Sequence, residues 1–178
     1  MANLLTAVRL VLAIPVALGF ANSEFLSGWV LLLLIIIACV TDFFDGKLAR
    51  ATNTASAKGQ LFDHTTDFIF VTLALTGCAI FGLINPYLPA LILIAFSQYV
   101  IDSYYLHKQK ELKMSFLGRW NGILYFGPLI FLAVSRLGLG EDSKELMEQM
   151  GSIFAWILSA STLLSIIDRG LAPLRKSD

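Results

Sequence analysis

Long apolar runs recur along the whole chain and are separated by short polar stretches. A transmembrane helix needs about 20 mostly apolar residues, and six segments come within a few residues of this length. Turn-forming residues such as Asn22 and Asn85 lie between neighbouring segments. The pattern predicts an all-α integral membrane protein with six transmembrane helices: Asn3–Phe20, Leu26–Ala49, Gly59–Leu83, Leu88–His107, Leu117–Val134 and Ile153–Leu171.

The first segment also fits a second interpretation, a cleavable signal peptide. Arg9 precedes a short apolar core that ends near Ala21, as in secretory signals. A single positive charge before the core favours a helix that stays in the protein, and the topology of the later segments is the same in either case.

Composition agrees with a membrane protein of one domain. Hydrophobic residues make up 57% of the 178 residues and charged residues 15%, against about 25% charged residues in soluble domains. No linker or low-complexity tract divides the chain, so we expect a single domain over residues 1–178. Cys39 and Cys78 lie inside apolar runs and are expected to be small buried side chains.

The basic residues predict the orientation. If both termini face the cytoplasm, eleven of the 13 Lys and Arg residues lie on the cytoplasmic side, and Arg136 and Lys144 lie outside. The acidic stretch from Glu141 to Glu148 would then form an external loop after the fifth helix. We therefore expect a multi-pass protein with cytoplasmic termini, in the plasma or inner membrane if the source is bacterial.

Four aspartates lie at the ends of two apolar segments. Asp42 and Asp45 are three residues apart near the end of the second segment, and Asp63 and Asp67 are four apart near the start of the third. These spacings place each pair on one helix face. Because a short connection joins the two helices, we expect the four carboxylates to face each other near the cytoplasmic surface.

Such a cluster needs compensating charge. Each charged aspartate in a membrane span costs roughly 2.5–3.5 kcal/mol, and like charges at close range must take up protons or collect cations. The local basic residues, Lys47, Arg50 and Lys58, are too few and too far along the chain to neutralise all four. Carboxylate oxygens suit Mg²⁺ or Mn²⁺, which bind proteins together with substrate phosphates. The cluster therefore predicts a divalent-cation site for a phosphoanhydride.

Glycines and one arginine lie beside the aspartates at fixed spacing. Gly46 and Gly59 would let a phosphate approach the backbone, and Arg50 can bind phosphate through two N–H groups. The whole pattern reads Asp42-x-x-Asp45-Gly46-x-x-Ala49-Arg50, eight further residues, then Gly59-x-x-x-Asp63-x-x-x-Asp67. It resembles the signature of the CDP-alcohol phosphotransferase family. Asn3-Leu4-Leu5-Thr6, followed by Arg9, resembles the N-terminal motif of the bacterial phosphatidyl-transferring members.

The resemblance implies a phospholipid-synthesis enzyme in which an alcohol attacks the β-phosphate of a CDP-linked donor and CMP leaves. Asp42, Asp45, Asp63 and Asp67 would hold two Mg²⁺ or Mn²⁺ ions, and Asp67 would also accept the proton of the acceptor hydroxyl. The CDP moiety would bind Asn3, Thr6, Gly46, Ala49, Arg50, Ser56 and Gly59. The expected partners are CDP-diacylglycerol, a small alcohol acceptor, membrane lipids and a second copy of the chain, with no nucleic acid.

Two acceptor alcohols are compatible with the sequence, glycerol 3-phosphate and an inositol-type polyol. Phe116-Leu117-Gly118-Arg119 resembles a Leu-Gly-Lys string of members that use glycerol phosphate, and Arg119 would hold an acceptor phosphate. The residues around Asp63 depart from the Leu-Asp-Pro string of those members, and Asp102 on the fourth segment would either orient the acceptor or bond a neighbouring helix.

Two alternative functions remain at this stage. His64 forms an Asp-His-x-x-Asp string that resembles the choline- and ethanolamine-phosphotransferase branch of the family, in which the CDP-alcohol donates to diacylglycerol. From a different class, an aspartate-lined cation transporter would also place carboxylates in the membrane. A transporter would have no need of the glycine and arginine spacing.

Overall fold

The structure is a computed structural model that describes residues 2–51, 57–101 and 116–171. Within these residues it contains helices and the turns between them, which confirms the all-α prediction. The helices are α1 (Ala2–Ala21), α2 (Gly28–Ala51), α3 (Ala57–Ile80), α4 (Tyr87–Ile101), α5 (Phe116–Leu124), α6 (Phe126–Val134) and α7 (Glu141–Leu171). The first four agree closely with the predicted segments over the described residues.

The fifth predicted segment is divided at Tyr125, between α5 and α6. Pro128 has no N–H group to donate to the carbonyl of Leu124, four residues earlier, so the regular hydrogen-bond series is interrupted there. Tyr125 nevertheless keeps helical dihedral angles, with φ −61° and ψ −22°. The two short helices therefore continue one another and act as one apolar segment, Leu117–Val134.

The prediction that the acidic stretch forms a loop is wrong, because α7 begins at Glu141 rather than near Ile153. Gly138 and Gly140 adopt positive φ angles of 74° and 99° and turn the chain into this helix. Glu141 and Asp142 occupy its first turn, where negative charge interacts favourably with the helix dipole. Hydropathy located the apolar part of α7 and missed its polar first turns.

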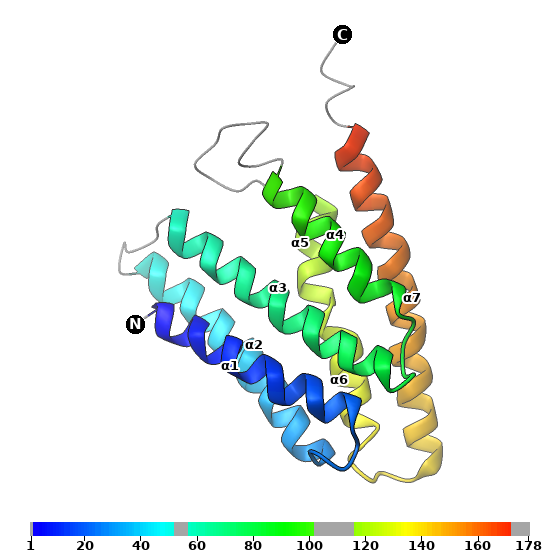
Figure 1. Ribbon diagram of the computed structural model, residues 1–178. Coiled ribbons are helices and arrows are strands. Elements are labelled where there is room, and N and C mark those ends of the chain that lie inside the picture. Colours follow the sequence, from blue (N-terminus) through cyan, green and yellow to red (C-terminus); the bar gives the residue numbers. More distant parts are fainter. Residues whose placement is uncertain (1, 52–56, 102–115, 172–178) are drawn as a thin grey trace.

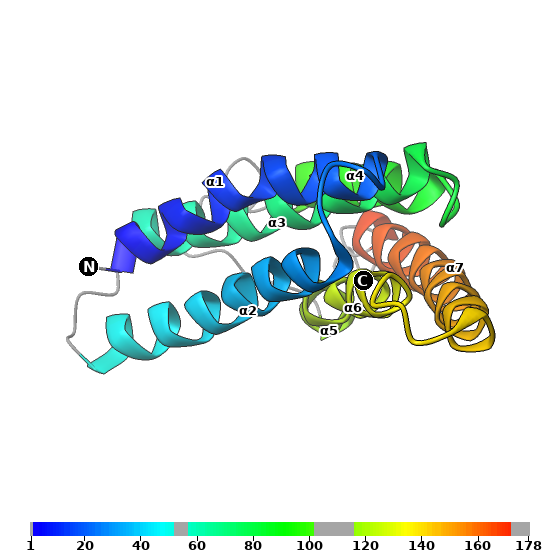
Figure 2. The ribbon, with the colours of Figure 1, turned by 90° about the horizontal axis from the view of Figure 1, so that it is seen from below.

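The helices form a ring around a common core. Each helix contacts its neighbour in the order α1, α2, α6, α7, α4 and α3, and α3 closes the ring against α1. Seen from below, α1, α3 and α4 form one layer and α2, α5, α6 and α7 form the other (Figure 2). The start of α1, the end of α2 and the start of α3 lie at one end of the bundle (Figure 1).

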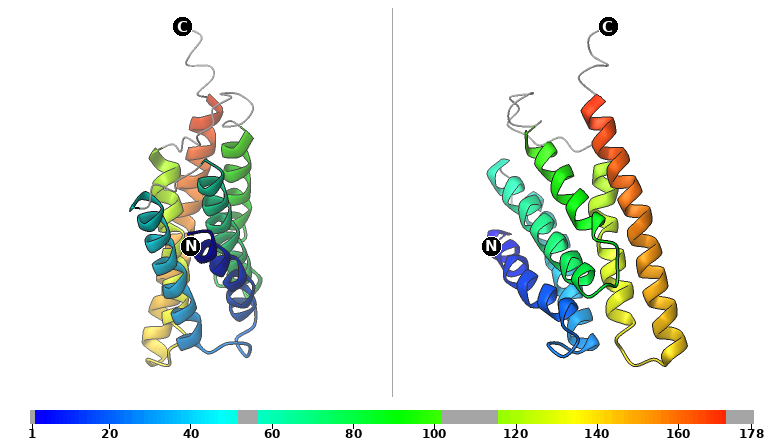
Figure 3. Two further views of the ribbon diagram at one scale, coloured as in Figure 1. Left: turned by 90° about the vertical axis from the view of Figure 1, so that its left-hand side faces the viewer. Right: turned by 45° about the vertical axis from the view of Figure 1, so that its right-hand side comes forward.

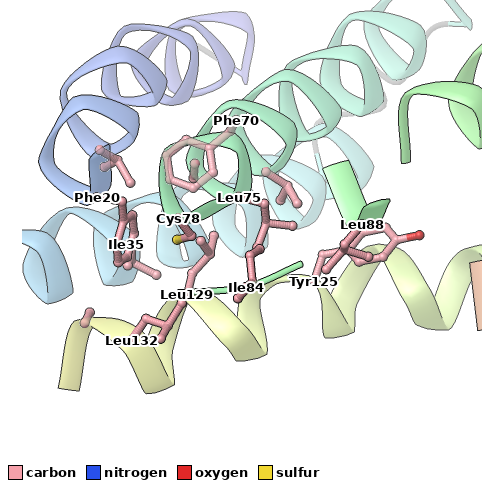
Figure 4. Packing of buried hydrophobic residues seen from close by; sticks show 14 of the residues in the cluster. Phe20, Ile35, Phe70, Leu75, Cys78, Ile84, Leu88, Tyr125, Leu129 and Leu132 are labelled. Carbon is pink, nitrogen blue, oxygen red and sulfur yellow. The ribbon is translucent and has the colours of Figure 1, made fainter. Parts of the chain in front are cut away.

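Buried residues follow inward stripes along the helices. On α1 they recur at intervals of three and four residues, as expected for one helix face. The core joins α1, α2 and α3 to α6 and to the start of α4 (Figure 4). The fully buried members of the first three stripes are Ala13, Val16, Phe20, Leu31, Ile35, Ala38, Phe70, Ala74, Leu75 and Cys78. The burial of Cys78 agrees with its expected role, and Cys39 is partly buried.

A glycine allows α1 and α3 to pack at very short distance. A Cβ atom on Gly77 would lie 2.2 Å from the carbonyl oxygen of Ala17. Small residues at helix contacts permit this kind of backbone approach in membrane proteins. The contact shows how closely the two backbones approach at this point.

The outward faces of the bundle are strongly apolar. Val11 and Ile80 are 70% and 72% exposed, and many other large apolar side chains share this surface. Soluble monomers rarely expose apolar patches on this scale, whereas lipid tails solvate them. Among the described residues, two helical segments are long and apolar enough to cross a membrane, Leu117–Val134 and α7. Both observations support the predicted membrane character.

Candidate active site

The inward stripes of α1, α2 and α3 change from apolar to charged at one end of the bundle. Arg9 lies four residues before buried Ala13 on α1, and Asp42 lies four residues after buried Ala38 on α2. On α3, Asp63 and Asp67 continue the stripe that contains Phe70 and Ala74. The periodicity that builds the core therefore also directs these four charged side chains inward.

Arg9 binds all three of these carboxylates. Its side chain is fully buried, and its Nη1 donates to Asp42 Oδ1 at 2.6 Å. The same nitrogen donates to Asp67 Oδ1, and Nη2 donates to Asp63 Oδ1. One guanidinium thus joins α1 to the aspartates of α2 and α3.

Arg9 was not predicted as a partner of the aspartates. The predicted partners were basic residues close to them in the chain, whereas Arg9 lies 33 residues before Asp42 and 58 before Asp67. One available signal was the spacing of Arg9 on the same stripe as Thr6 and Ala13, which identifies it as an inward position. A charged residue on the buried face of an apolar helix requires a counter-charge.

The donor set fits a divalent cation even with Arg9 in place. The carboxylates of Asp42, Asp63 and Asp67 exceed the single guanidinium by two negative charges, which equals the charge of one Mg²⁺ or Mn²⁺. Asp63, His64 and Asp67 each offer a ligand atom, and these atoms lie within 4.8 Å of one another. Carboxylate oxygens are the ligands that these ions prefer.

A large cavity begins at the aspartates and extends between α3, α4, α5 and α7. Its volume is about 730 Å³. Asp42, Asp63 and Asp67 contribute to one wall, and the side chains of Phe68 and Phe96, stacked 4.0 Å apart, contribute to another. An internal space of this size is typical of small-molecule sites.

The wall formed by α5 and α7 is polar and carries positive charge. Arg119 and Asn121 come from α5, and Thr162 and Arg169 come from α7. The Thr162 hydroxyl lies 2.8 Å from the Tyr125 hydroxyl, so hydrogen bonding connects α7 to the junction between α5 and α6. The sequence analysis identified Arg119 and missed Arg169, because no local pattern linked the last helix to the cavity.

The remaining predicted residues fall into three groups. Thr6 is buried on α1, one turn before Arg9, and Gly59 is half-buried near the start of α3. A second group lies on α1 or α2 with side chains outside the described part of the structure: Asn3, Asp45, Gly46, Ala49 and Arg50. Ser56 and Asp102 lie outside the described residues altogether. The structure thus brings together three of the four predicted metal ligands and describes no side chain for the fourth.

Comparison with known proteins identifies related chains. A CDP-diacylglycerol–glycerol-3-phosphate 3-phosphatidyltransferase of Cereibacter sphaeroides is 30% identical over 84% of this chain and 68% of its own length. A protein of the same name from Rickettsia felis is 26% identical over 92% of this chain and 89% of its own. Cholinephosphotransferase 1 of Danio rerio is 37% identical, but over 44% of this chain and 20% of its own length.

The family signature covers nearly the whole chain. The CDP-alcohol phosphatidyltransferase family matches residues 1–167, which include every described helix except the last turn of α7. The family expected from the aspartate motif is therefore confirmed, as is the prediction of an enzyme. The chain belongs to the CDP-alcohol phosphatidyltransferase family.

Proposed function

We propose that this enzyme transfers a phosphatidyl group from CDP-diacylglycerol to a small hydroxyl acceptor and releases CMP. The observation that carries the proposal is the convergence of Asp42, Asp63 and Asp67 on the wall of a cavity, in a member of this family. The apolar outer surface suits a lipid donor, because its acyl chains stay in the bilayer while its headgroup reaches the aspartates.

The aspartates would recognise the diphosphate through metal ions. Asp42, Asp45, Asp63 and Asp67 would hold two Mg²⁺ or Mn²⁺ ions, which when bound would neutralise the diphosphate and stabilise charge on the attacking and leaving oxygens. Thr6 and Gly59, with Asn3, Gly46, Ala49, Arg50 and Ser56, line the CDP site. Thr6 is buried on the same stripe as Arg9, one turn before it.

Asp67 accepts the proton during transfer. As the acceptor oxygen forms a bond to the phosphatidyl phosphorus, its proton passes to the Asp67 carboxylate. The bond from phosphorus to the bridging oxygen breaks, and its electron pair leaves with CMP. Asp67 lines the cavity with its side chain 26% exposed, so an acceptor there can reach it. The hydrogen bond from Arg9 orients one carboxylate oxygen.

The acceptor approaches from the α5 and α7 wall. Arg119 and Arg169 line the same cavity as the aspartates, and guanidinium groups bind phosphate through paired hydrogen bonds. An acceptor with a phosphate and a hydroxyl therefore suits the two walls together. Glycerol 3-phosphate has this chemistry, and the names of the Cereibacter and Rickettsia relatives contain it.

A second candidate is transfer from CDP-choline or CDP-ethanolamine to diacylglycerol. It is favoured by His64, which lies between Asp63 and Asp67 on the cavity wall, and by the short local similarity to the Danio rerio cholinephosphotransferase. The same cavity and aspartates would serve both reactions, so the identity of the donor separates them.

The enzyme spans the membrane six times as a single domain over residues 1–178, with both termini and the aspartate site at the cytoplasmic face. The start of α1 and the end of α7 point toward the same end of the bundle as the end of α2 and the start of α3 (Figure 3). An even number of membrane crossings places both termini on one side. The distribution of Lys and Arg supports the cytoplasmic assignment of that end. We expect a homodimer, as the family resemblance suggests.

One assay tests the proposal. Purified protein in detergent, with Mg²⁺, is incubated with CDP-diacylglycerol and either glycerol 3-phosphate, inositol, inositol phosphate or serine, and CMP and the lipid product are measured. A parallel reaction contains CDP-choline and diacylglycerol. We expect CMP and a phosphatidyl lipid with glycerol 3-phosphate, and much slower CMP release from Asp67→Asn. CMP formation from CDP-choline alone would favour the second candidate, and no CMP from any mixture would exclude both.

A further inference from the structure

We propose that Arg9 is a positioning residue, a built-in counter-cation that holds Asp42, Asp63 and Asp67 together until a divalent cation binds. The inference rests on the proposed metal site and extends it to a residue outside the aspartate motif. Arg9 contacts the carboxylates rather than any reacting atom, so its effect on the reaction passes through them.

Burial and charge provide the first argument. Arg9 is fully buried, whereas Asp42 on α2 has a side chain 46% exposed. Without the guanidinium, three like charges from two helices would face each other at one end of the bundle. Such groups repel or take up protons, and removal of one partner from a buried ionic cluster leaves uncompensated charge. Arg9 therefore lowers the repulsion among the three aspartates while no metal ion is bound.

The geometry of the hydrogen bonds provides the second argument. Nη1 is shared between Asp42 on α2 and Asp67 on α3, and Nη2 binds Asp63. Because a guanidinium is planar with fixed donor directions, it sets the spacing of oxygens that belong to different helices. Lysine at this position would provide charge without the fixed directions.

A metal ion and Arg9 would neutralise the same carboxylates. Each stabilises the folded protein, but their stabilising effects are not additive. Once a divalent cation is bound, part of the counter-charge that Arg9 supplies is redundant. The metal should therefore stabilise a variant without the guanidinium more than it stabilises the wild type. By thermodynamic linkage, the same variant should bind the metal more tightly.

The test compares Arg9→Gln with the wild type in purified, substrate-free protein. Thermal unfolding is measured in excess chelator and in saturating Mn²⁺, and Mn²⁺ affinity is measured by electron paramagnetic resonance. We expect the Tm of Arg9→Gln in chelator to fall by about 10 °C and to recover by more than half in Mn²⁺. We also expect the Mn²⁺ affinity to rise by about tenfold. A Tm loss of equal size with and without Mn²⁺ would overturn the proposal.

Two further variants make the result specific. Arg136→Gln is the matched control, since Arg136 also donates to partners on another segment, the carbonyls of Gly19 and Phe20, but at the other end of α1. Its Tm should fall equally with and without Mn²⁺. Arg9→Lys keeps the charge and replaces Arg9→Gln as the test variant if Arg9→Gln does not fold. In chelator its Tm should fall less than that of Arg9→Gln, and in Mn²⁺ its Tm should recover. A loss of Tm that Mn²⁺ leaves unchanged would contradict the inference.

These measurements do not depend on turnover. If the protein produced no CMP but Arg9→Gln showed the metal-dependent recovery, the proposed reaction would fail and the role of Arg9 would stand. If CMP were produced and the recovery were absent, the proposed reaction would stand and the role of Arg9 would fail.

Discussion

The contact between Gly77 and Ala17 makes a prediction that links helix packing to catalysis. In Gly77→Ala the new Cβ would lie 2.2 Å from the Ala17 carbonyl oxygen, whereas a carbon and an oxygen in contact need about 3.3 Å. Helices α1 and α3 must therefore separate by about 1 Å. Overpacking of this kind costs about 1–3 kcal/mol, which exceeds the gain of at most about 1 kcal/mol from the better helix propensity of alanine.

The displacement should reach the aspartate site. Arg9 lies eight residues from Ala17, about 12 Å along α1 at 1.5 Å per residue, and a stiff helix transmits the shift. A misplacement of about 1 Å at a catalytic constellation can cost about 100-fold in rate. We expect Gly77→Ala to lower the Tm by about 5 °C and the turnover number by at least about tenfold.

The assay is thermal unfolding in detergent together with CMP release. Gly170→Ala is the matched control, because its Cβ would meet Gln98 Nε2 at 3.7 Å, an ordinary contact. It should keep the Tm and turnover of the wild type. Wild-type stability and turnover in Gly77→Ala would refute the argument that this close approach positions Arg9.

Three further predictions concern the site itself. Asp67→Asn removes the proton acceptor and should lower turnover by about 10²–10⁴-fold, with bound Mn²⁺ measured separately to distinguish lost catalysis from lost metal. Excess chelator should abolish CMP release and Mg²⁺ or Mn²⁺ should restore it; full activity in chelator would end the metal hypothesis. Arg119→Gln should raise the KM for glycerol 3-phosphate by about tenfold or more with little change in the KM for CDP-diacylglycerol, and equal changes in both would contradict its assignment to the acceptor.

The helices and the motif were predictable because both depend on residues that are close together in the sequence. Apolar runs long enough to span a bilayer located α1 to α4 closely, and the spacing of Asp42, Asp63 and Asp67 placed them on inward faces. The polar first turns of α7 and the interruption at Tyr125 were not predicted, because hydropathy over a window does not register a helix dipole or a missing N–H group.

Contacts between distant segments could not be predicted in the same way. The approach of α1 to α3 at Gly77 brings Arg9 among carboxylates 33 to 58 residues away, and the packing of α7 on α4 and α5 brings Arg169 and Thr162 to the cavity of the aspartates. Periodicity tells which face of a helix is buried. It does not tell which other face will meet it, because that depends on how closely particular side chains let two backbones approach.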